Sequence, residues 1–368
     1  MPNSSPLPTL ITQQDQLDLL CSAISDQQQI ALDTEFMRTS TYAPMLGLLQ
    51  VKIQDMSVCI DPLAELDMGQ TWELLFDPKR SCIIHSAKQD MEVIYFEKGA
   101  VVGELIDTQI CAALLGHPAQ IGYAGLTMEL LGISINKSQT RTDWSRRPLS
   151  EAQLRYAAED VEHLPTLLNI MREQLETLGR YDWAREDSAA MLDLTLYKPD
   201  PSNAWTRVKS MPFLPVEQQA RARALTDWRE RRAVASDKPR QWIMSDKALL
   251  QIAQENPDGT QALGRLDEVP AGLANNQGKK LLAIINNANQ ANARGELKLR
   301  QCKPDRDKSA LRKLSGLVKT RAIELNISAE VLASKRDIQA LLRNDANPKV
   351  NTGWRKEIIG KELVKAMA

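Results

Sequence analysis

Sulfur and imidazole ligands are scarce in this 368-residue sequence. Its five cysteines form no C-x-x-C pair, and its three histidines lack the spacing typical of metal ligands. The odd cysteine count argues against a disulfide framework, and the histidine pattern argues against a zinc site. We therefore expect buried, reduced thiols in a reducing compartment. The cysteines are Cys21, Cys59, Cys82, Cys111 and Cys302.

Long apolar runs are also missing. No stretch approaches the ~18 residues that a membrane-spanning helix needs. Residues 1–10 contain proline and serine but neither a basic n-region nor an apolar h-region, so the sequence predicts no signal peptide. Apolar residues make up 43% and charged residues 25%, which is typical of a globular protein, and the length indicates two or three domains.

Charge is distributed unequally along the chain. Residues 1–193 hold 14 Lys and Arg against 28 Asp and Glu, whereas residues 194–368 hold 32 against 19. The net charge of −1 therefore hides an acidic half and a basic half. A basic domain attracts polyanions such as nucleic acid, although charge can also drift between domains for solubility alone.

The first half alternates strand and helix patterns. Apolar runs predict strands at 30–36, 48–53, 58–60, 82–85 and 105–107, with a turn around 54–57. Periodic apolar residues predict helices at 14–24, from 86 to about 97, and after 107 through 115. This order predicts an α/β fold, in which a mixed sheet starts as an antiparallel meander and continues with βα units.

Two segments have the Ser-x-x-Gln pattern of a capping box, one beginning at Ser86 and one at Ser150. The helix that begins at Ser150 is predicted to run without a break towards residue 178. Tyr156 and Asp160 lie on it four residues apart, so they share one helix face.

The second half contains no convincing strand pattern. A Pro-rich segment at 198–203 reads as a linker, and short amphipathic helices follow it. Breaks near 256–259 and 301–304 divide these helices. We predict a linker at 194–204 and two small all-α modules at 205–292 and 303–368.

A pair of acidic residues ends the first long apolar strand. Alternate side chains of a strand point to one face, so Asp33 and Glu35 lie side by side. At a separation of ~4 Å and an effective dielectric of ~20, two such charges repel by about 4 kcal/mol. A shared proton, a basic partner or a divalent cation can offset this repulsion, and Mg²⁺ prefers oxygen ligands. A lone D-x-E pattern is more often a solvent-facing strand end.

Two further carboxylates, Asp90 and Asp160, follow later in the chain on predicted helices. Asp90 lies in the first turn of a predicted helix, where aspartate is also favoured by the helix dipole alone. Tyr156 and Asp160 share a helix face, which is also the pattern of an amphipathic edge with a packed Tyr and a solvated Asp. Each segment has an ordinary structural explanation, but all three occur in one chain.

Together these segments resemble the DEDD exonucleases, in the branch that has Tyr in its third motif. The first motif is Asp33-Thr34-Glu35, the second supplies Asp90, and the third supplies Tyr156 and Asp160. The resemblance is closest to the ribonuclease D family, and it covers residues 1–193. Its signature segments here read DTEFMRTSTYAPMLGLLQ at 33–50, IDTQ at 106–109 and RTDWSRRPL at 141–149.

The tail resembles the helical modules that this family carries. Residues 204–209 (AWTRVK) and 225–233 (LTDWRERRA) resemble an HRDC domain, a nucleic-acid-binding module. We assign this domain to 205–292 and a divergent second copy, inferred from its position and helical pattern, to 303–368. The resemblance thus implies a ribonuclease H-like nuclease domain at 1–193 followed by two HRDC-type domains.

The resemblance also implies a mechanism. Two divalent metal ions, Mg²⁺ or Mn²⁺, would be held by Asp33, Glu35, Asp90 and Asp160, with Asp33 bridging both. Tyr156 would orient the attacking water, because an unperturbed phenol, with a pKa near ~10, is a poor base at neutral pH. The implied activity is 3′→5′ exoribonuclease release of 5′-mononucleotides from tRNA precursors and other small structured RNAs, by a cytoplasmic monomer.

Substrate contacts are predicted around these motifs, each beside a structural alternative. Basic residues near the third motif can hold phosphates, or they can form a basic loop around a packed indole. His85 can touch substrate or be a hydrogen-bonded structural histidine, and Asp107 more plausibly caps a helix than binds metal. The predicted substrate contacts are Phe36, Met37, His85, Lys137, Arg141, Trp144, Arg146 and Arg147.

Three rival functions share features with this sequence. A DNA exonuclease would use the same carboxylates, because RNA specificity requires a contact to the 2′-hydroxyl that the sequence does not locate. A helicase is excluded because no G-x-x-x-x-G-K-[ST] phosphate loop occurs. An inactive binding protein is disfavoured because all four carboxylates and the Tyr are present.

Overall fold

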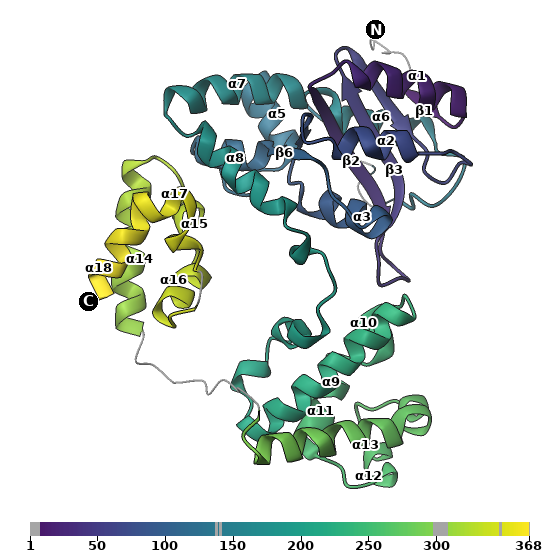
Figure 1. The fold of residues 1–368 in the computed structure, drawn as a ribbon, viewed down its shortest axis with the longest axis vertical. Coiled ribbons are helices and arrows are strands. Elements are labelled where there is room, and N and C mark those ends of the chain that lie inside the picture. Colours follow the sequence, from purple (N-terminus) through teal and green to yellow (C-terminus); the bar gives the residue numbers. More distant parts are fainter. Residues whose placement is uncertain (1–7, 137–138, 140–141, 297–307, 346–347, 368) are drawn as a thin grey trace. The chain divides into compact units, whose positions relative to one another are not determined.

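The computed structural model describes residues 8–136, 139, 142–296, 308–345 and 348–367 (Figure 1). Contacts within the chain divide it into two units, which are treated separately below. The first unit holds the described residues of 1–37, 44–197 and 305–368, and the second holds those of 38–43 and 198–304. The second helical module of the tail therefore clusters with the sheet-containing part of the chain.

The first unit contains a six-stranded sheet in the order β1-β4-β3-β2-β5-β6. The neighbours β2, β3 and β4 pair antiparallel, whereas the pairs β1·β4, β2·β5 and β5·β6 are parallel. The predicted mixed sheet with an early meander is confirmed, and the short β1 is an additional strand. The strands are β1 (Thr9–Ile11), β2 (Gln29–Met37), β3 (Met45–Ile53), β4 (Met56–Ile60), β5 (Ser81–Ile84) and β6 (Glu104–Asp107).

Helices cover both faces of this sheet, as Figure 1 shows. Up to residue 189 they are α1 (Gln14–Ser25), α2 (Gly69–Phe76), α3 (Lys88–Lys98), α4 (Thr108–Leu114), α5 (Tyr123–Leu131), α6 (Glu151–Glu162), α7 (Leu164–Thr177) and α8 (Tyr181–Ala189). The predicted helices at 14–24, 86–97 and 107–115 are confirmed within a few residues.

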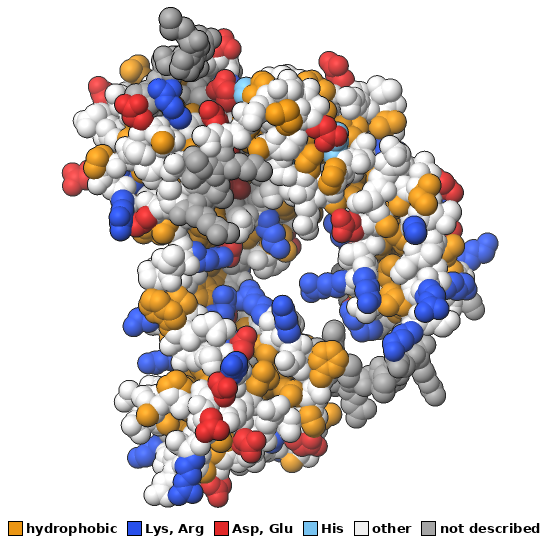
Figure 2. Space-filling model, turned by 180° about the vertical axis from the view of Figure 1, so that it is seen from behind, with side chains coloured by type: hydrophobic (Ala, Val, Ile, Leu, Met, Phe, Trp, Pro, Cys, Tyr) orange, Lys and Arg blue, Asp and Glu red, His pale blue; other side chains and the backbone are white. Residues whose placement is uncertain are grey.

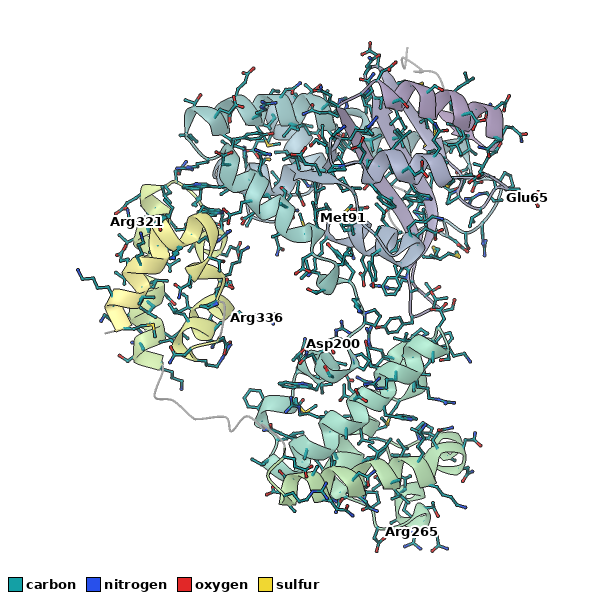
Figure 3. All side chains as sticks on the ribbon, in the orientation of Figure 1. Glu65, Met91, Asp200, Arg265, Arg321 and Arg336 are labelled. Carbon is teal, nitrogen blue, oxygen red and sulfur yellow. The ribbon has the colours of Figure 1, made fainter. Side chains whose placement is uncertain are left out.

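The central strand β2 contributes to two hydrophobic cores. Ile30 and Leu32 belong to the core that contains residues of α1, α2 and α3, including Met91 (Figure 3). Ala31 belongs to the other, with residues of α4 and α7. Because side chains alternate along a strand, Asp33 and Glu35 follow Ala31 onto the second face. Apolar packing of β2 on both sides therefore determines which way the two carboxylates point.

Only one of the two predicted capping boxes forms. The Ser150 hydroxyl accepts a hydrogen bond from the backbone N–H of Gln153, and the Gln153 side-chain oxygen accepts one from the backbone N–H of Ser150. Ser86 makes no such bond: the prediction was wrong, because Ser86 takes a left-handed φ of 64° and Ala87 is the N-cap of α3. The signal at Ser86 was overridden by a tight strand-to-helix turn.

The predicted continuous helix from Ser150 towards residue 178 is also wrong. It is divided into α6 and α7 at His163, next to Pro165 in the first turn of α7. Proline lacks a backbone N–H, so Pro165 cannot donate to the carbonyl four residues before it, and the hydrogen-bond ladder of one continuous helix is interrupted there. Tyr123 covers the junction, since its hydroxyl donates to the Glu159 carbonyl and accepts from the His163 N–H. Tyr156 and Asp160 stay on one helix because the break lies beyond them.

The C-terminal helices of the first unit share its second core. Leu314 and Val318 are buried in the same cluster as residues of α4 and α7. The Arg355 guanidinium forms a buried bidentate ion pair with Asp187 of α8. The described elements are α14 (Lys308–Glu324), α15 (Ala329–Leu332), α16 (Lys335–Leu342), α17 (Gly353–Arg355), the π-helical turn η6 (Lys356–Gly360) and α18 (Lys361–Met367), with the 3₁₀ turn η5 (Lys349–Asn351) before α17.

The second unit is all-helical in its described part, as predicted. A core around Leu225, Leu249 and Leu281 joins its main helices. Buried Glu230 pairs with Arg207 and Arg240. The helices are α9 (Val216–Ala235), α10 (Arg240–Ile243), α11 (Asp246–Glu255), α12 (Thr260–Gly264) and α13 (Ala271–Ala293). The predicted linker contains 3₁₀ turns, η2 (Leu194–Leu196) and the start of η3 (Pro201–Arg207).

The described residues bear on the predictions about the cysteines and about membrane-spanning helices. Cys21, Cys59, Cys82 and Cys111 are free and buried, as expected, whereas Cys302 lies outside the described residues. No helix in the described part of the chain is both long and apolar enough to cross a membrane.

Candidate active site

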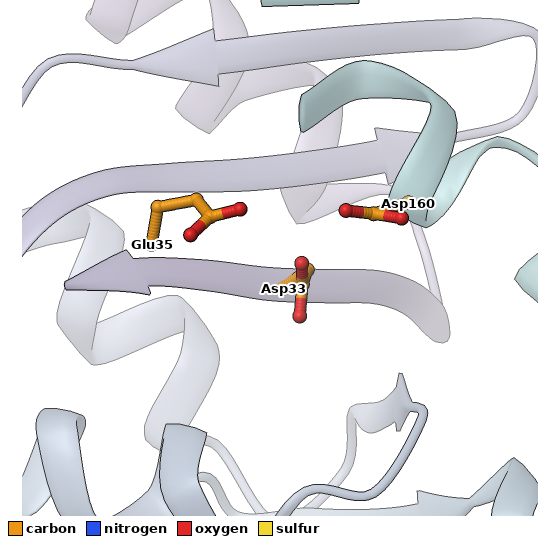
Figure 4. Close-up of side chains that lie close together, drawn as sticks. All are labelled: Asp33, Glu35 and Asp160. Atoms are coloured by element: carbon orange, nitrogen blue, oxygen red, sulfur yellow. The ribbon is translucent and has the colours of Figure 1, made fainter. Parts of the chain in front are cut away.

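Three carboxylates from two elements converge at the centre of the first unit. Asp33 and Glu35 stand on β2, and Asp160 reaches them from the last turn of α6 (Figure 4). One oxygen from each carboxylate lies within 4.8 Å of the other two. In the described part of the chain, this is the one group of His, Cys, Asp or Glu residues close enough to hold a metal ion.

The fourth carboxylate, Asp90, approaches β2 from α3. It is 6% exposed, and its Oδ1 accepts hydrogen bonds from the Thr34 N–H at 3.1 Å and the Thr34 hydroxyl at 2.6 Å. Thr34 lies between Asp33 and Glu35, so its two donors join the second predicted motif to the first. The structure thus brings Asp33, Glu35 and Asp160 together and places Asp90 beside them on the wall of the same cavity, outside the group of oxygens within 4.8 Å.

Burial raises the proton affinity of Asp33, Glu35 and Asp90, and repulsion within the cluster adds to this effect for Asp33 and Glu35. The pKa of Asp33 lies well above its ordinary range, first because the side chain is desolvated and then because Asp90, Asp160 and Glu35 surround it. The same causes, burial and then Asp160 and Asp90, raise the pKa of Glu35 to about 8. Burial raises the pKa of Asp90 to about 7, against the lowering effect of its bonds from Thr34. At neutral pH the cluster therefore needs protons or cations to be stable.

A divalent cation fits this donor set. Asp33, Glu35 and Asp160 offer only oxygen atoms, within the mutual distance at which one ion can contact all three. Hard cations such as Mg²⁺ and Mn²⁺ prefer such carboxylate oxygens, and no soft thiolate or imidazole belongs to the group.

Two aromatic residues lie beside the cluster. Tyr156 is one helical turn before Asp160, and its ring is 6.2 Å from that of Trp144. The Trp144 indole is 2% exposed and packs with Leu48 and Ala157 in a small core. The alternative of a packed indole is therefore what the structure shows for Trp144, although this residue also lines a cavity over the carboxylates.

A cavity of 320 Å³ opens over the carboxylates. Its walls come from the end of β2, the start of α3 and the segment before α6. The lining residues are Asp33, Thr34, Glu35, Phe36, His85, Ser86, Gln89, Asp90, Thr142 and Trp144. Of the predicted substrate contacts, Phe36, His85 and Trp144 line this cavity, whereas Met37 packs beside the small core around Trp144.

His85 is fully engaged by protein atoms. Its Nδ1 lies 2.9 Å from the Thr108 hydroxyl and its Nε2 lies 2.9 Å from the Ile121 carbonyl. Burial lowers the pKa of its imidazole, so the ring is neutral at physiological pH. The structural alternative thus describes its bonding, while its ring still forms part of the cavity wall.

The predicted basic contacts divide into three groups. Arg147 donates to both oxygens of buried Asp61 at 2.6 Å and to the Gly47 carbonyl, so its guanidinium anchors a loop. Arg146 is largely exposed and pairs with Asp143. Lys137 and Arg141 lie outside the described residues.

Sequence reasoning missed two residues that organise the site. Thr34 contacts Asp90 across 56 positions, and no local pattern marks it apart from its place between two acidic residues. Asp61 had no signal because its partner is 86 positions away. Burial alone would raise the pKa of Asp61, but its hydrogen bonds from Arg147 hold it below the ordinary value.

Three protein-family models match three successive segments of the chain. A family model described as 3′-5′ exonuclease matches residues 8–176. A model described as HRDC domain matches 218–285, and one described as Ribonuclease D, C-terminal HRDC domain matches 306–363. Both helical modules are thus supported, including the divergent second copy.

Individual relatives agree with these matches. A protein named Ribonuclease D from Granulibacter bethesdensis is 35% identical to the chain, and the match covers 98% of this chain and 92% of that protein. A protein of the same name from a Shewanella species is 32% identical, and the match covers 96% of this chain and 93% of that protein. The crystal structure of Escherichia coli RNase D, titled an exoribonuclease involved in structured RNA processing, superposes with a TM-score of 0.88 at 31% identity over 98% of both chains. The catalytic core of RRP6 from Trypanosoma brucei shares the fold, with a TM-score of 0.61 at 21% identity over 79% of this chain and 82% of that one.

The repulsion among the carboxylates predicts an unusual stability effect. In chelator, Asp33→Asn should raise the free energy of unfolding by ~1–2 kcal/mol, because it removes one charge from a buried cluster. The pKa values of Asp33 and Glu35 are raised in the folded state, so the gain should be small near pH 5 and grow as pH rises towards 8. Urea unfolding at both pH values measures it.

The same variant should lose stabilisation by Mn²⁺. Wild-type protein should gain ~2.7 kcal/mol at 100 times its Kd, because the ion binds only the folded state. Asp182→Asn, at a carboxylate that is 92% exposed, is the matched control and should behave like wild type. An equal Mn²⁺ effect in Asp33→Asn and wild type would contradict the assignment of Asp33 as a ligand.

Proposed function

This chain belongs to the ribonuclease D family of 3′→5′ exoribonucleases, and we propose that it removes 3′ nucleotides from RNA with two divalent cations. Asp33, Glu35, Asp90 and Asp160 would hold these ions, with Asp33 shared between them. Mg²⁺ or Mn²⁺ would supply activation of water and stabilisation of charge on the leaving oxygen. The observation that carries the proposal is the convergence of three ligand oxygens within 4.8 Å beside a cavity.

The chain's own residues would complete the chemistry. Tyr156, one turn from Asp160 on α6, would donate a hydrogen bond that orients the attacking water. Phe36 and Trp144 would form the apolar part of the cavity that receives the terminal nucleotide. Thr34 would keep Asp90 against β2, since both its donors already serve that carboxylate.

The helical parts of the chain would bind the body of the RNA. In the second unit, a groove of 910 Å³ runs along α9 and α13. Its lining includes four basic residues, Arg223, Arg231, Arg232 and Lys280, and two acidic residues, Asp227 and Glu296. Figure 2 shows Lys and Arg side chains gathered on the visible face of α14–α18 as well. Such cations neutralise backbone phosphates without reading sequence.

The substrate would be a small structured RNA. One relative in this family is titled an exoribonuclease involved in structured RNA processing, and tRNA precursors with 3′ extensions are RNAs of that kind. We further propose cytoplasmic action as a monomer. As domain boundaries we propose 1–193 for the nuclease, 205–292 and 303–368 for the HRDC domains, and a linker at 194–204.

Product analysis tests the nuclease assignment. With Mg²⁺, the wild-type protein should release 5′-mononucleotides one at a time from RNA oligonucleotides and from a tRNA with an extended 3′ end, but not from matched DNA. Asp160→Asn should lower the rate by at least ~10³-fold, because the loss of a metal ligand removes several kcal/mol of transition-state stabilisation. Its affinity for RNA should stay within ~3-fold, because positioning by phosphate contacts remains.

Asp182→Asn is again the control and should retain full activity. Unchanged turnover in Asp160→Asn would contradict the metal assignment. Equal degradation of DNA and RNA would replace the exoribonuclease by a nuclease without sugar preference, and internal cleavage products would exclude an exonuclease.

The groove on α9 and α13 predicts a salt effect. Arg232→Gln should weaken binding of single-stranded RNA and flatten the dependence of log K on log salt by ~0.7, the value for one lost phosphate contact. Arg265→Gln, at the end of α12 and outside the groove, should leave the slope unchanged. Titrations from low to physiological salt measure both, and identical slopes for the two variants would remove the groove from the RNA path.

A further inference from the structure

A buried aspartate outside the four-carboxylate set connects two parallel strands at their ends. Asp107 is the last residue of β6, is 2% exposed, and pairs in register with Ile84, the last residue of β5. Just beyond Ile84 the chain turns at Ser86 and Ala87 into α3, which carries Asp90. Asp107 therefore lies beside the turn that positions one of the proposed metal ligands.

The hydrogen bonds of Asp107 exceed those of a helix cap. Its Oδ1 accepts from the N–H groups of Gln109 at 2.7 Å and Ile110 at 3.4 Å, which caps α4 as predicted. The same carboxylate also accepts from the Ser86 N–H at 3.0 Å and, through Oδ2, from the Ala87 N–H at 2.8 Å. Capping α4 requires only the bonds from Gln109 and Ile110, so the bonds from Ser86 and Ala87 have a separate structural role.

The bonds from Ser86 and Ala87 hold an uncommon backbone conformation. Ser86 has a φ of 64°, a region that non-glycine residues seldom adopt. Two consecutive N–H groups that donate to one fixed carboxylate keep the turn in this form. The Ala87 carbonyl then accepts from the Met91 N–H, and this bond closes the first turn of α3, which contains Asp90.

Asp90 is thus held from two sides. Thr34 of β2 donates to its carboxylate, and Asp107 of β6 holds the backbone from which its helix starts. Release of the turn would let the first turn of α3 shift against β2, and Asp90 would present its oxygens in a different place. The Asp107 backbone N–H in turn donates to the Ser188 hydroxyl of α8 at 3.0 Å, which fixes Asp107 itself.

We propose that Asp107 is a positioning residue of the nuclease site, whose carboxylate holds the Ser86–Ala87 turn and thereby sets the metal affinity of Asp90. This inference rests on the proposed function, because it takes Asp90 as a metal ligand. Groups that orient metal ligands commonly change metal affinity or activity 10–100-fold when they are removed.

Asp107→Asn tests the proposal with little change in shape. Asparagine is as good an N-cap as aspartate, so the cap of α4 survives. Its side-chain NH₂, however, would face a backbone N–H of the turn, and two donors cannot bond each other. The Mn²⁺ concentration for half-maximal thermal stabilisation, and that for half-maximal activity, should each rise ~10-fold or more, whereas KM for RNA should stay within ~2-fold. Excess Mn²⁺ should restore most of the activity.

The control is Asp200→Asn, which makes the same exchange at an exposed cap in the second unit (Figure 3). It should leave both Mn²⁺ concentrations at their wild-type values. A folded Asp107→Asn protein with wild-type Mn²⁺ concentrations would overturn the proposal. Activity that is lost without a change in Mn²⁺ binding, and that excess Mn²⁺ does not restore, would also overturn it.

A second variant tests the proposal if the Asp107→Asn protein does not fold. Asp107→Ser keeps an N-cap for α4 but lacks the second oxygen that reaches Ala87, so it should show the same rise in Mn²⁺ concentration. If neither variant folds, Asp107 belongs to the stability of the fold and the proposal fails. A wild-type protein without Mn²⁺-dependent activity would instead contradict the proposed function, which distinguishes the two failures.

Discussion

Four carboxylates gathered around strand β2, three half-buried and Asp90 buried, repel one another, and much of the first unit is arranged to keep them there. Asp33 and Glu35 cannot move apart, because the apolar side chains of β2 are fixed in cores on both faces of the sheet. Burial and repulsion raise the pKa of Asp33 and Glu35 until charge must be neutralised by protons or cations. A site that is costly without cations is well suited to bind them, since binding relieves the repulsion.

Neighbouring groups hold the carboxylates against this repulsion. Thr34 fixes Asp90, Asp107 fixes the turn before α3, and Arg147 binds Asp61 and the Gly47 carbonyl beside the Trp144 segment. Thr34, Asp107 and Arg147 are not among the four carboxylates or the Tyr to which a catalytic role is given, although they lie in or near the same sequence motifs. The chemistry is thus carried by a few acidic residues, and its geometry is carried by neutral donors and ion pairs around them.

Sequence reasoning worked best where information is local or periodic. Apolar runs located β2 through β6, and the Ser150 box located the start of α6, because both depend on residues near one another in the chain. It failed at Ser86, where the same box pattern occurs but a distant carboxylate imposes a left-handed turn. It also overlooked the break at Pro165, a proline in the first turn of a new helix that was taken as part of a longer one.

For the candidate site too, local patterns were readable from the sequence and long-range contacts were not. The order of Asp33, Glu35, Asp90, Tyr156 and Asp160 was readable because each lies in a recognisable motif. The partners of Arg147 and His85 were not readable, because they lie far along the chain: Asp61 for one, and Thr108 with Ile121 for the other. The sequence offered a structural role for each beside substrate contact, but long-range pairing leaves no local pattern that names the partners.

The central claim is that these carboxylates hold two metal ions. A crystal of the wild-type protein soaked in Mn²⁺ with a mononucleotide product, measured at a wavelength where manganese scatters anomalously, tests it directly. Two anomalous peaks about 3.5–4 Å apart are expected, both in contact with Asp33, one also near Glu35 and Asp160 and the other on the side of Asp90. Peaks elsewhere, or an empty carboxylate cluster at saturating Mn²⁺, would contradict it.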